Sequence, residues 1–262
     1  MRVVIVGAGN LATNLAVALQ KAGHVLVQVY SRTAQSAELL AKRVGVPAVT
    51  DLHQLARDAD LYIVSISDSA LPTLDYSAFP SQALVVHTAG SIPMDVIPLT
   101  RRGVFYPMQT FSRQRIVDFR EIPIFVEASS EEDTCFLTDF ASSINNKVYR
   151  LSSADRRYLH LAAVFCSNFV NHCYAMSEDI LRQHGIPFSV MLPLVDEVAA
   201  KVHQVSPHDA QTGPAIRHDD NVIRHHLSLL DDQPRLQEIY SLMSESIQAE
   251  QCNNLRIKKL NN

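Results

Sequence analysis

The turn that follows the first apolar run limits what this chain can fold into more than any other feature. Residues 3–12 read VVIVGAGNLA. The four apolar residues predict a buried strand, and the amphipathic pattern that begins near Asn10 predicts a helix. Between the two stand Gly7, Gly9 and Ala12, with the spacing Gly-x-Gly-x-x-Ala. A strand, this glycine spacing and a helix, in that order, form the fingerprint of a dinucleotide-binding fold.

Each residue of this turn has a physical role in such a fold. Gly7 permits the tight turn, Gly9 lets the backbone approach a pyrophosphate, and Ala12 lets the helix pack closely on the strand. The free N–H groups and the positive dipole end of the helix attract phosphate. We therefore expect the pyrophosphate of a cofactor to bind at Gly7, Gly9, Asn10 and Leu11.

The residues after the second predicted strand, Val25–Tyr30, indicate which dinucleotide binds. A site for NAD usually places Asp or Glu about 20 residues after the glycines, where it accepts from the ribose 2′-hydroxyl. This chain has Ser31, Arg32 and Thr33 instead. A guanidinium pairs with phosphate through two N–H groups, whereas a carboxylate would repel it. We therefore expect NADP(H); the alternative is a Rossmann-like fold that binds a different nucleotide or none.

Composition argues against several other classes of function. The 262 residues carry a net charge of −4, which gives no electrostatic basis for binding nucleic acid or an anionic membrane. The longest apolar stretch, Leu161–Phe165, is too short to span a bilayer. The four cysteines form no Cys-x-x-Cys pair, which favours reduced thiols in the cytoplasm. The eleven histidines show no zinc-binding spacing, so we expect no metal site.

Strand and helix patterns alternate in the first half of the chain. Strands are predicted at Arg2–Val6, Val25–Tyr30, Leu61–Ser65, Ala83–His87, Gly103–Tyr106, Ile122–Glu127 and Lys147–Arg150. Helices are predicted at Leu11–Lys21, Ala34–Arg43, Asp51–Arg57 and Glu131–Ser142. Such alternation indicates a Rossmann-type, mainly parallel sheet that is covered on both faces.

After residue 150 the pattern becomes entirely helical. Long helical stretches are predicted at Ala154–His184, Phe188–Gln204, Asn221–Leu230 and Leu236–Gln251. The sequence therefore predicts an α/β fold followed by an all-helical C-terminal domain. We place the dinucleotide-binding domain at residues 1–150 and a helical substrate and dimerisation domain at residues 151–262.

Polar residues follow the predicted strands at their carboxyl ends, where an open parallel sheet binds its ligands. The segment Ser65–Ser69 should pass alongside the dinucleotide, with Ser67 as a contact. His87 and Thr88 should lie at the nicotinamide end, where Gln109 and Thr110 are further candidates. The alternative is that these are solvated loop residues.

Two other features of these strand exits have simpler explanations. Capping of the next helix is the favoured account of Asp68, Ser69 and Ser91. Gly90, in the sequence HTAGS, indicates either a close approach of the backbone to a ligand or an ordinary tight turn.

The helical half offers a second set of polar candidates. At 100° per residue, His160, Ser167, Asn171 and Glu178 lie on one stripe of an otherwise apolar helix, and Asn168 borders it. The stripe predicts a face toward the substrate; the alternative is a polar seam between helices or subunits. The loop Ser206–Asp220 adds the donors Gln211 and Thr212, for which helix capping is the alternative.

The segments VGAGNLA, SRT, HTAGSIP, YPMQTF, LHLAAVFCSNFVNH and SPHDAQTGPAIR resemble a bacterial family of Rossmann-like NADP oxidoreductases with a C-terminal helical domain of unknown function. The chain is more distantly similar to pyrroline-5-carboxylate reductase. The resemblance implies the fold, an NADP(H) cofactor and a homodimer built through the helical domain. The related β-hydroxyacid dehydrogenases use a catalytic lysine, but this chain has no lysine between Lys147 and Lys201, so that mechanism does not carry over.

These observations lead to one main functional hypothesis and two others. The main one is reduction of a small C=O or C=N substrate held between the two domains. His160 is the expected proton donor, because imidazole titrates near neutral pH; Asn168, Asn171, Gln211 and Thr212 would orient the substrate. The second is a non-catalytic NADP-binding sensor or scaffold, which predicts an exposed apolar patch on the helical half. The third, oxidation of a hydroxy acid, is disfavoured by the missing lysine.

Overall fold

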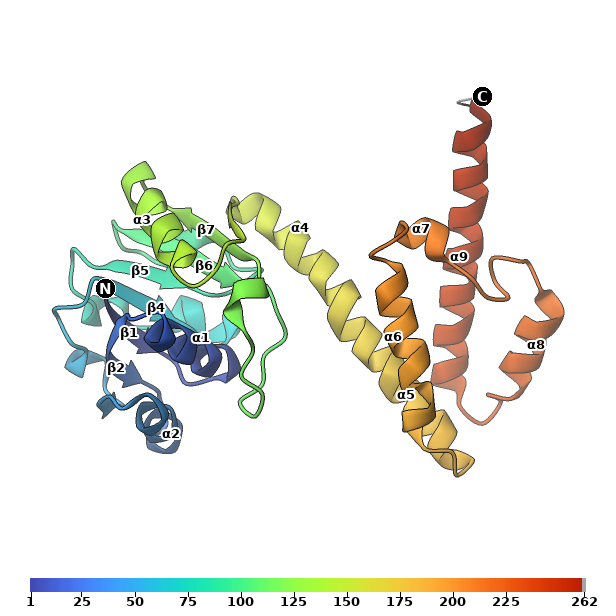
Figure 1. Ribbon diagram of the computed structural model, residues 1–262, viewed down its shortest axis with the longest axis horizontal. Coiled ribbons are helices and arrows are strands. Elements are labelled where there is room, and N and C mark those ends of the chain that lie inside the picture. The colour runs from blue at the N-terminus through green and yellow to red at the C-terminus, as the bar shows by residue number, and fades with distance from the viewer. Residues whose placement is uncertain (261–262) are drawn as a thin grey trace. The chain divides into compact units, whose positions relative to one another are not determined.

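The computed structural model describes the backbone of residues 1–260 and the side chains of residues 1–251. Its strands are β1 (Arg2–Val6), β2 (Val25–Tyr30), β3 (Ala48–Val49), β4 (Leu61–Val64), β5 (Leu84–His87), β6 (Arg102–Pro107), β7 (Ile124–Ala128) and β8 (Val148–Arg150). Its α-helices are α1 (Asn10–Lys21), α2 (Ala34–Val44), α3 (Glu131–Ser142), α4 (Ser153–Ala163), α5 (Val170–Gln183), α6 (Leu192–Lys201), α7 (Pro207–Ala210), α8 (Asp220–Ser228) and α9 (Pro234–Leu260) (Figure 1).

The strands form one sheet in the order β3-β2-β1-β4-β5-β6-β7-β8. All neighbouring pairs are parallel except β6 and β7, so the predicted mainly parallel sheet is confirmed. The seven predicted strands are present, and only the two-residue β3 was not predicted. The strand order reverses between β1 and β4, and in open parallel sheets ligands bind beside such a point.

Apolar residues cover both faces of the sheet, as its continuous hydrophobic strands require. Along β1, Val3 and Ile5 pack in a core with Leu15 of α1, whereas Val4 and Val6 face a second core that includes Tyr62. Each of these side chains is fully buried, which contributes roughly 1.5–3 kcal/mol per aliphatic residue. The two cores hold β1 and β4 rigidly at the position where the glycine-rich turn begins.

The chain divides into two compact units, Met1–Val170 and Asn171–Asn262. The sheet ends at Arg150, where the sequence predicts the domain boundary, but the first unit continues through α4. The reason is a buried ion pair: Arg156 of α4, which is 1% exposed, donates to the Glu127 carboxylate at 2.7 Å and to the carbonyl of Ile92 at 2.6 Å. These bonds fix α4 to the sheet.

A π-helical segment, Val164–Phe169, separates α4 from α5. Its hydrogen bonds span five residues instead of four, so the side chains do not keep the 100° spacing of an α-helix. The predicted polar stripe from His160 to Glu178 assumed that spacing throughout. It is therefore wrong as a continuous stripe, and Asn171 and Glu178 belong to the second compact unit.

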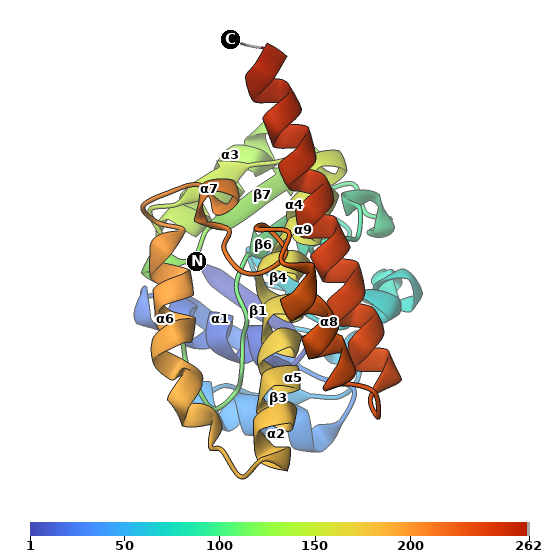
Figure 2. The same cartoon turned by 90° about the vertical axis from the view of Figure 1, so that its right-hand side faces the viewer.

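The second unit contains α6 to α9 and nearly all of α5. Helix α8 runs beside α9 (Figures 1 and 2), and the ring of His226 bonds to the hydroxyl of Tyr240 at 2.8 Å between them. Few of its described residues are buried: Ala215 and Leu230 are the two hydrophobic ones. Within residues 1–260, no helix is both long and apolar enough to cross a bilayer.

Candidate dinucleotide-binding site

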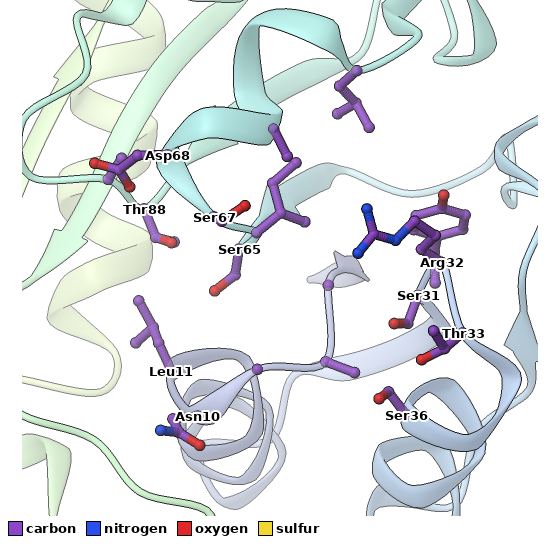
Figure 3. A pocket seen from close by; sticks show the side chains of 18 of the residues that line it. Asn10, Leu11, Ser31, Arg32, Thr33, Ser36, Ser65, Ser67, Asp68 and Thr88 are labelled. Atoms are coloured by element: carbon purple, nitrogen blue, oxygen red, sulfur yellow. The ribbon is translucent and has the colours of Figure 1, made fainter.

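A cavity of about 960 Å³ opens at the carboxyl ends of β1, β2, β4 and β5, within the first unit. Figure 3 shows most of its labelled side chains in three groups, with Asn10 and Leu11 apart from them at the start of α1. Ser31, Arg32, Thr33 and Ser36 gather on one side, Asp68 and Thr88 on the opposite side, and Ser65 and Ser67 between them. The backbone of Gly7, Ala8 and Gly9 forms the floor.

The glycine-rich turn has the geometry that its sequence predicts. Gly7 has φ +120°, and a Cβ there would lie 2.0 Å from the carbonyl oxygen of Ser65, so only glycine fits. Gly9 has the opposite surroundings, because a Cβ would meet no atom within 4 Å and would extend into open space. Gly9 is also the N-cap of α1, and no side chain caps that helix. An open backbone surface with an uncapped helix end fits a pyrophosphate.

The Ser-Arg-Thr segment lines the same cavity directly after β2. Arg32 is exposed, and Thr33 is the N-cap of α2 without making a side-chain cap. Ser36, in the first turn of α2, adds a further hydroxyl that the sequence analysis missed. A guanidinium, three hydroxyls and a second uncapped helix end fit a phosphate group better than a hydroxyl, because each of them favours negative charge.

At the opposite end, His160 of α4 reaches the cavity beside Tyr106, the fifth residue of β6. The Tyr106 hydroxyl lies 3.0 Å from His160 Nδ1. A Cβ on Gly90 would stand 2.4 Å from the same nitrogen, so the glycine gives the imidazole its space. Burial raises the pKa of Tyr106, which keeps the hydroxyl protonated. The sequence predicts that the segment Tyr106–Thr110 reaches the nicotinamide end, but it does not single out Tyr106 as a candidate, and this pair was not predicted.

His87 differs from its prediction as a cofactor contact. Its side chain is fully buried and does not line the cavity. Nδ1 accepts from the backbone N–H of Ala89 at 3.1 Å, and Nε2 faces the carbonyl of Pro93 at 3.3 Å. Desolvation, with the nearby charge of Arg156, lowers the pKa of His87 to about 4. His87 therefore shapes the loop that carries Thr88, while Thr88 itself lines the cavity as predicted.

Ser67 and Asp68 line the middle of the cavity. Ser67 is the N-cap of a short 3-10 helix but makes no side-chain cap. The hydroxyl of Ser91 donates to the Asp68 carboxylate at 2.7 Å. The capping that we expected of Asp68 and Ser91 is replaced by this bond, which joins the loops after β4 and β5.

The remaining predicted residues do not line the cavity. Gln109 accepts from the backbone N–H of Thr110 at 2.8 Å, so these two residues bond to each other. Asn168 is exposed on the π-helical segment, and Asn171, Gln211 and Thr212 are exposed in the second unit. Their assignment to substrate orientation stays a prediction. Among the described residues, no group of three or more metal-ligating side chains forms a cluster.

Comparison with known proteins agrees with this architecture. The model of a Rossmann-like domain matches residues 1–110, and that of the domain of unknown function DUF2520 matches residues 122–247. The crystal structure of a putative NADP oxidoreductase from Bacteroides fragilis is 54% identical, with a TM-score of 0.90 over 95% of this chain and 98% of that one. The chain belongs to this family of Rossmann-like proteins with a DUF2520 domain.

More distant structures share the fold of this family member. A protein from Thermotoga maritima is 21% identical, with a TM-score of 0.76 over 93% of this chain and 98% of its own. A 1-pyrroline-5-carboxylate reductase from Streptococcus pyogenes is 15% identical, with a TM-score of 0.64 over 95% and 98%. Among curated proteins, none matches this chain.

Proposed function

We propose that this protein is an NADP(H)-dependent oxidoreductase that reduces a small C=O or C=N substrate. The observation that carries the proposal is the position of Arg32. Its guanidinium lines the same cavity as the glycine-rich turn, with the hydroxyls of Ser31 and Thr33 beside it. The 54% identical relative from Bacteroides fragilis, described as a putative NADP oxidoreductase, supports the same cofactor.

Different residues of the cavity would bind different parts of the cofactor. The backbone N–H groups near Gly9, Asn10 and Leu11 would hold the pyrophosphate, and Ser31, Arg32 and Thr33 the 2′-phosphate. Ser67 and Thr88 would line the path toward the nicotinamide. When bound, the cofactor supplies the hydride, and the protein supplies orientation and electrostatics.

The pair of His160 and Tyr106 supplies the proton that a reduced carbonyl needs. His160 lies at the end of the cavity opposite Arg32, and its Nδ1 is held by the Tyr106 hydroxyl at 3.0 Å. A protonated imidazole whose Nδ1–H donates to the Tyr106 oxygen can give its Nε2 proton to an alkoxide that forms beside it, and the ring is left neutral. An imine that is already protonated in water needs no such acid, so His160 is required mainly for a carbonyl.

Turnover tests this proposal. Purified protein is mixed with NADPH and panels of small ketones and imines, and loss of nicotinamide absorbance is followed. We expect at least one substrate to be reduced, and His160→Gln to lower kcat for a ketone by about 10²-fold or more. Unchanged ketone reduction by that variant would remove His160 from the mechanism. Reduction of a substrate with NADH but not with NADPH would overturn the cofactor assignment.

We also propose that the helical unit forms a homodimer. Leu194 and Val198 of α6 are 60% and 58% exposed, and Val202, four residues further, is 45% exposed. Residues spaced by four lie near one face of a helix, so this is a continuous apolar stripe. A unit of this length needs a buried core, and its described residues bury few apolar side chains. A second copy of the same stripe would supply the missing contacts.

Light scattering after size-exclusion chromatography tests the dimer. We expect the mass of two chains for the wild type, and a smaller mass or loss of folded protein for Leu194→Asp combined with Val198→Asp. Glu197→Ala, on the same helix, is the control and should leave the mass unchanged. A wild-type protein with the mass of one chain would contradict the proposal.

The exposed stripe also favours a second candidate function, an NADP-binding sensor or scaffold without turnover. Such a protein would bind a different partner on α6 and would leave every substrate of the panel unreduced.

The described cysteines Cys135, Cys166 and Cys173 are free thiols, which supports the cytoplasm as the compartment for either function.

A further inference from the structure

We infer that Arg113, in the loop between β6 and β7, binds the pyrophosphate of the cofactor. This inference rests on the proposed function and assigns a second cationic anchor to the same site. Arg113 lines the cavity, and its Nη2 donates to the carbonyl oxygen of Ala8 at 2.6 Å. Ala8 stands between Gly7 and Gly9, so the guanidinium lies directly at the glycine-rich turn.

The loop that carries Arg113 is fixed to α1 by one buried amide. Asn14, which is fully buried, donates from Nδ2 to the carbonyl of Ser112 at 2.8 Å. Its Oδ1 accepts from the backbone N–H of Val117 at 3.0 Å. The two bonds bracket Arg113 on both sides in the chain. Arg43 of α2 adds a bond from Nη1 to the carbonyl of Arg113 at 3.1 Å.

Aromatic and core packing also holds the loop that carries Arg113. The ring of Phe111 stacks on that of Phe119, with centroids 5.8 Å apart, and Phe111 packs against the core that contains Ile5 and Leu15. The backbone of residues 111–119 is therefore held at several points that do not depend on the Arg113 side chain. This matters for the test, because removal of the guanidinium should leave the loop in place.

Charge then explains what the guanidinium does there. The cavity has two arginines, Arg32 at the Ser-Arg-Thr segment and Arg113 at the glycine-rich turn. NADP(H) carries negative charge at two separate places, the 2′-phosphate and the pyrophosphate. A guanidinium carries five N–H donors, and the bond to Ala8 uses one. The others can pair with phosphate oxygens that the backbone N–H groups of α1 also attract.

Titration of four ligands tests this assignment. The ligands are NADPH, NADH, ADP and adenosine 2′-monophosphate, and binding is measured by calorimetry. Arg113→Ala should weaken NADPH, NADH and ADP by the same factor, about tenfold or more for a lost charge-assisted hydrogen bond. It should leave adenosine 2′-monophosphate unchanged, since that ligand has no pyrophosphate. Arg32→Ala should have the opposite pattern, weakening NADPH and adenosine 2′-monophosphate only.

Arg115→Ala is the matched control, because Arg115 is exposed in the same loop and does not line the cavity. It should change none of the four affinities, and Arg113→Lys should retain part of the binding. If the wild type binds NADPH and Arg113→Ala binds it equally well, the inference is wrong. An equal loss of all four ligands would show that Arg113 only supports the loop and would also overturn it. Failure of the wild type to bind NADPH would instead reject the proposed function.

Discussion

The buried imidazole of His87 makes the fold sensitive to acid in a way that can be calculated. In the folded protein its pKa is lowered to about 4 from an ordinary value of 6.5, first because of burial. Below pH 6.5 the unfolded chain therefore binds a proton that the folded chain does not, so stability falls as pH falls. Protonation of Nδ1 would also break the bond from the Ala89 N–H.

The size of this effect follows from the two pKa values. From about pH 7.5 to about pH 5 the difference in proton binding removes roughly 2 kcal/mol of unfolding free energy. Most of that loss occurs below pH 6.5, where the unfolded imidazole titrates. Fewer than half of the folded molecules carry the proton until the pH approaches 4. The expected slope is therefore close to that of one proton between about pH 6 and pH 4.5.

Urea unfolding at a series of pH values measures this slope. Carboxylates also contribute at low pH, so the comparison is with His87→Gln, whose amide can accept from Ala89 but does not titrate. The unfolding free energy of the wild type, relative to that of the variant, should fall by about 2 kcal/mol from about pH 7.5 to pH 5. Equal pH dependence of the two proteins would refute the assignment of a neutral, buried His87.

Three further pairs of substitutions test particular contacts. Gly7→Ala combines positive φ with a Cβ 2.0 Å from the Ser65 carbonyl and should cost about 3 kcal/mol in urea unfolding, whereas Gly23→Ala, with positive φ but open surroundings, should cost about 1; equal costs would contradict the clash. Gly90→Ala should lower stability by about 1–3 kcal/mol by displacing the His160 ring, and His160→Ala should relieve it in a double-mutant cycle. Additive effects of those two changes would show that the residues do not touch. Glu127→Ala should cost about 3–5 kcal/mol because it leaves the charge of Arg156 buried without its carboxylate partner, while Glu238→Ala, which removes an exposed ion pair, should leave the melting temperature nearly unchanged.

The parts of the fold that follow regular patterns could be predicted from the sequence. The seven predicted strands are short and mainly apolar segments bounded by turn residues, and the Gly-x-Gly-x-x-Ala turn has one known geometry. The side of the cavity that contains Arg32 could be predicted from these patterns, because Arg32 lies directly after the end of a strand. Only the short β3, paired to β2 by two residues, carried no such pattern.

The remaining site residues could not be predicted because long-range packing positions them. Arg113 meets Ala8 across 105 residues of chain, from a loop without regular periodicity. Tyr106 and His160 meet because α4 is fixed to the sheet by the buried Arg156. The prediction of a polar stripe failed at the π-helical segment, since the sequence VFCSNF gave no indication of a change in helical type.

The most direct test of the account is the ratio of two dissociation constants for the wild-type protein. NADPH and NADH are titrated separately, and nicotinamide fluorescence follows binding. Because Arg32 and its neighbouring hydroxyls face the 2′-position in the proposed complex, NADPH should bind at least tenfold more tightly than NADH. Equal binding of the two, or binding of neither, would contradict the central claim that this cavity is built for NADP(H).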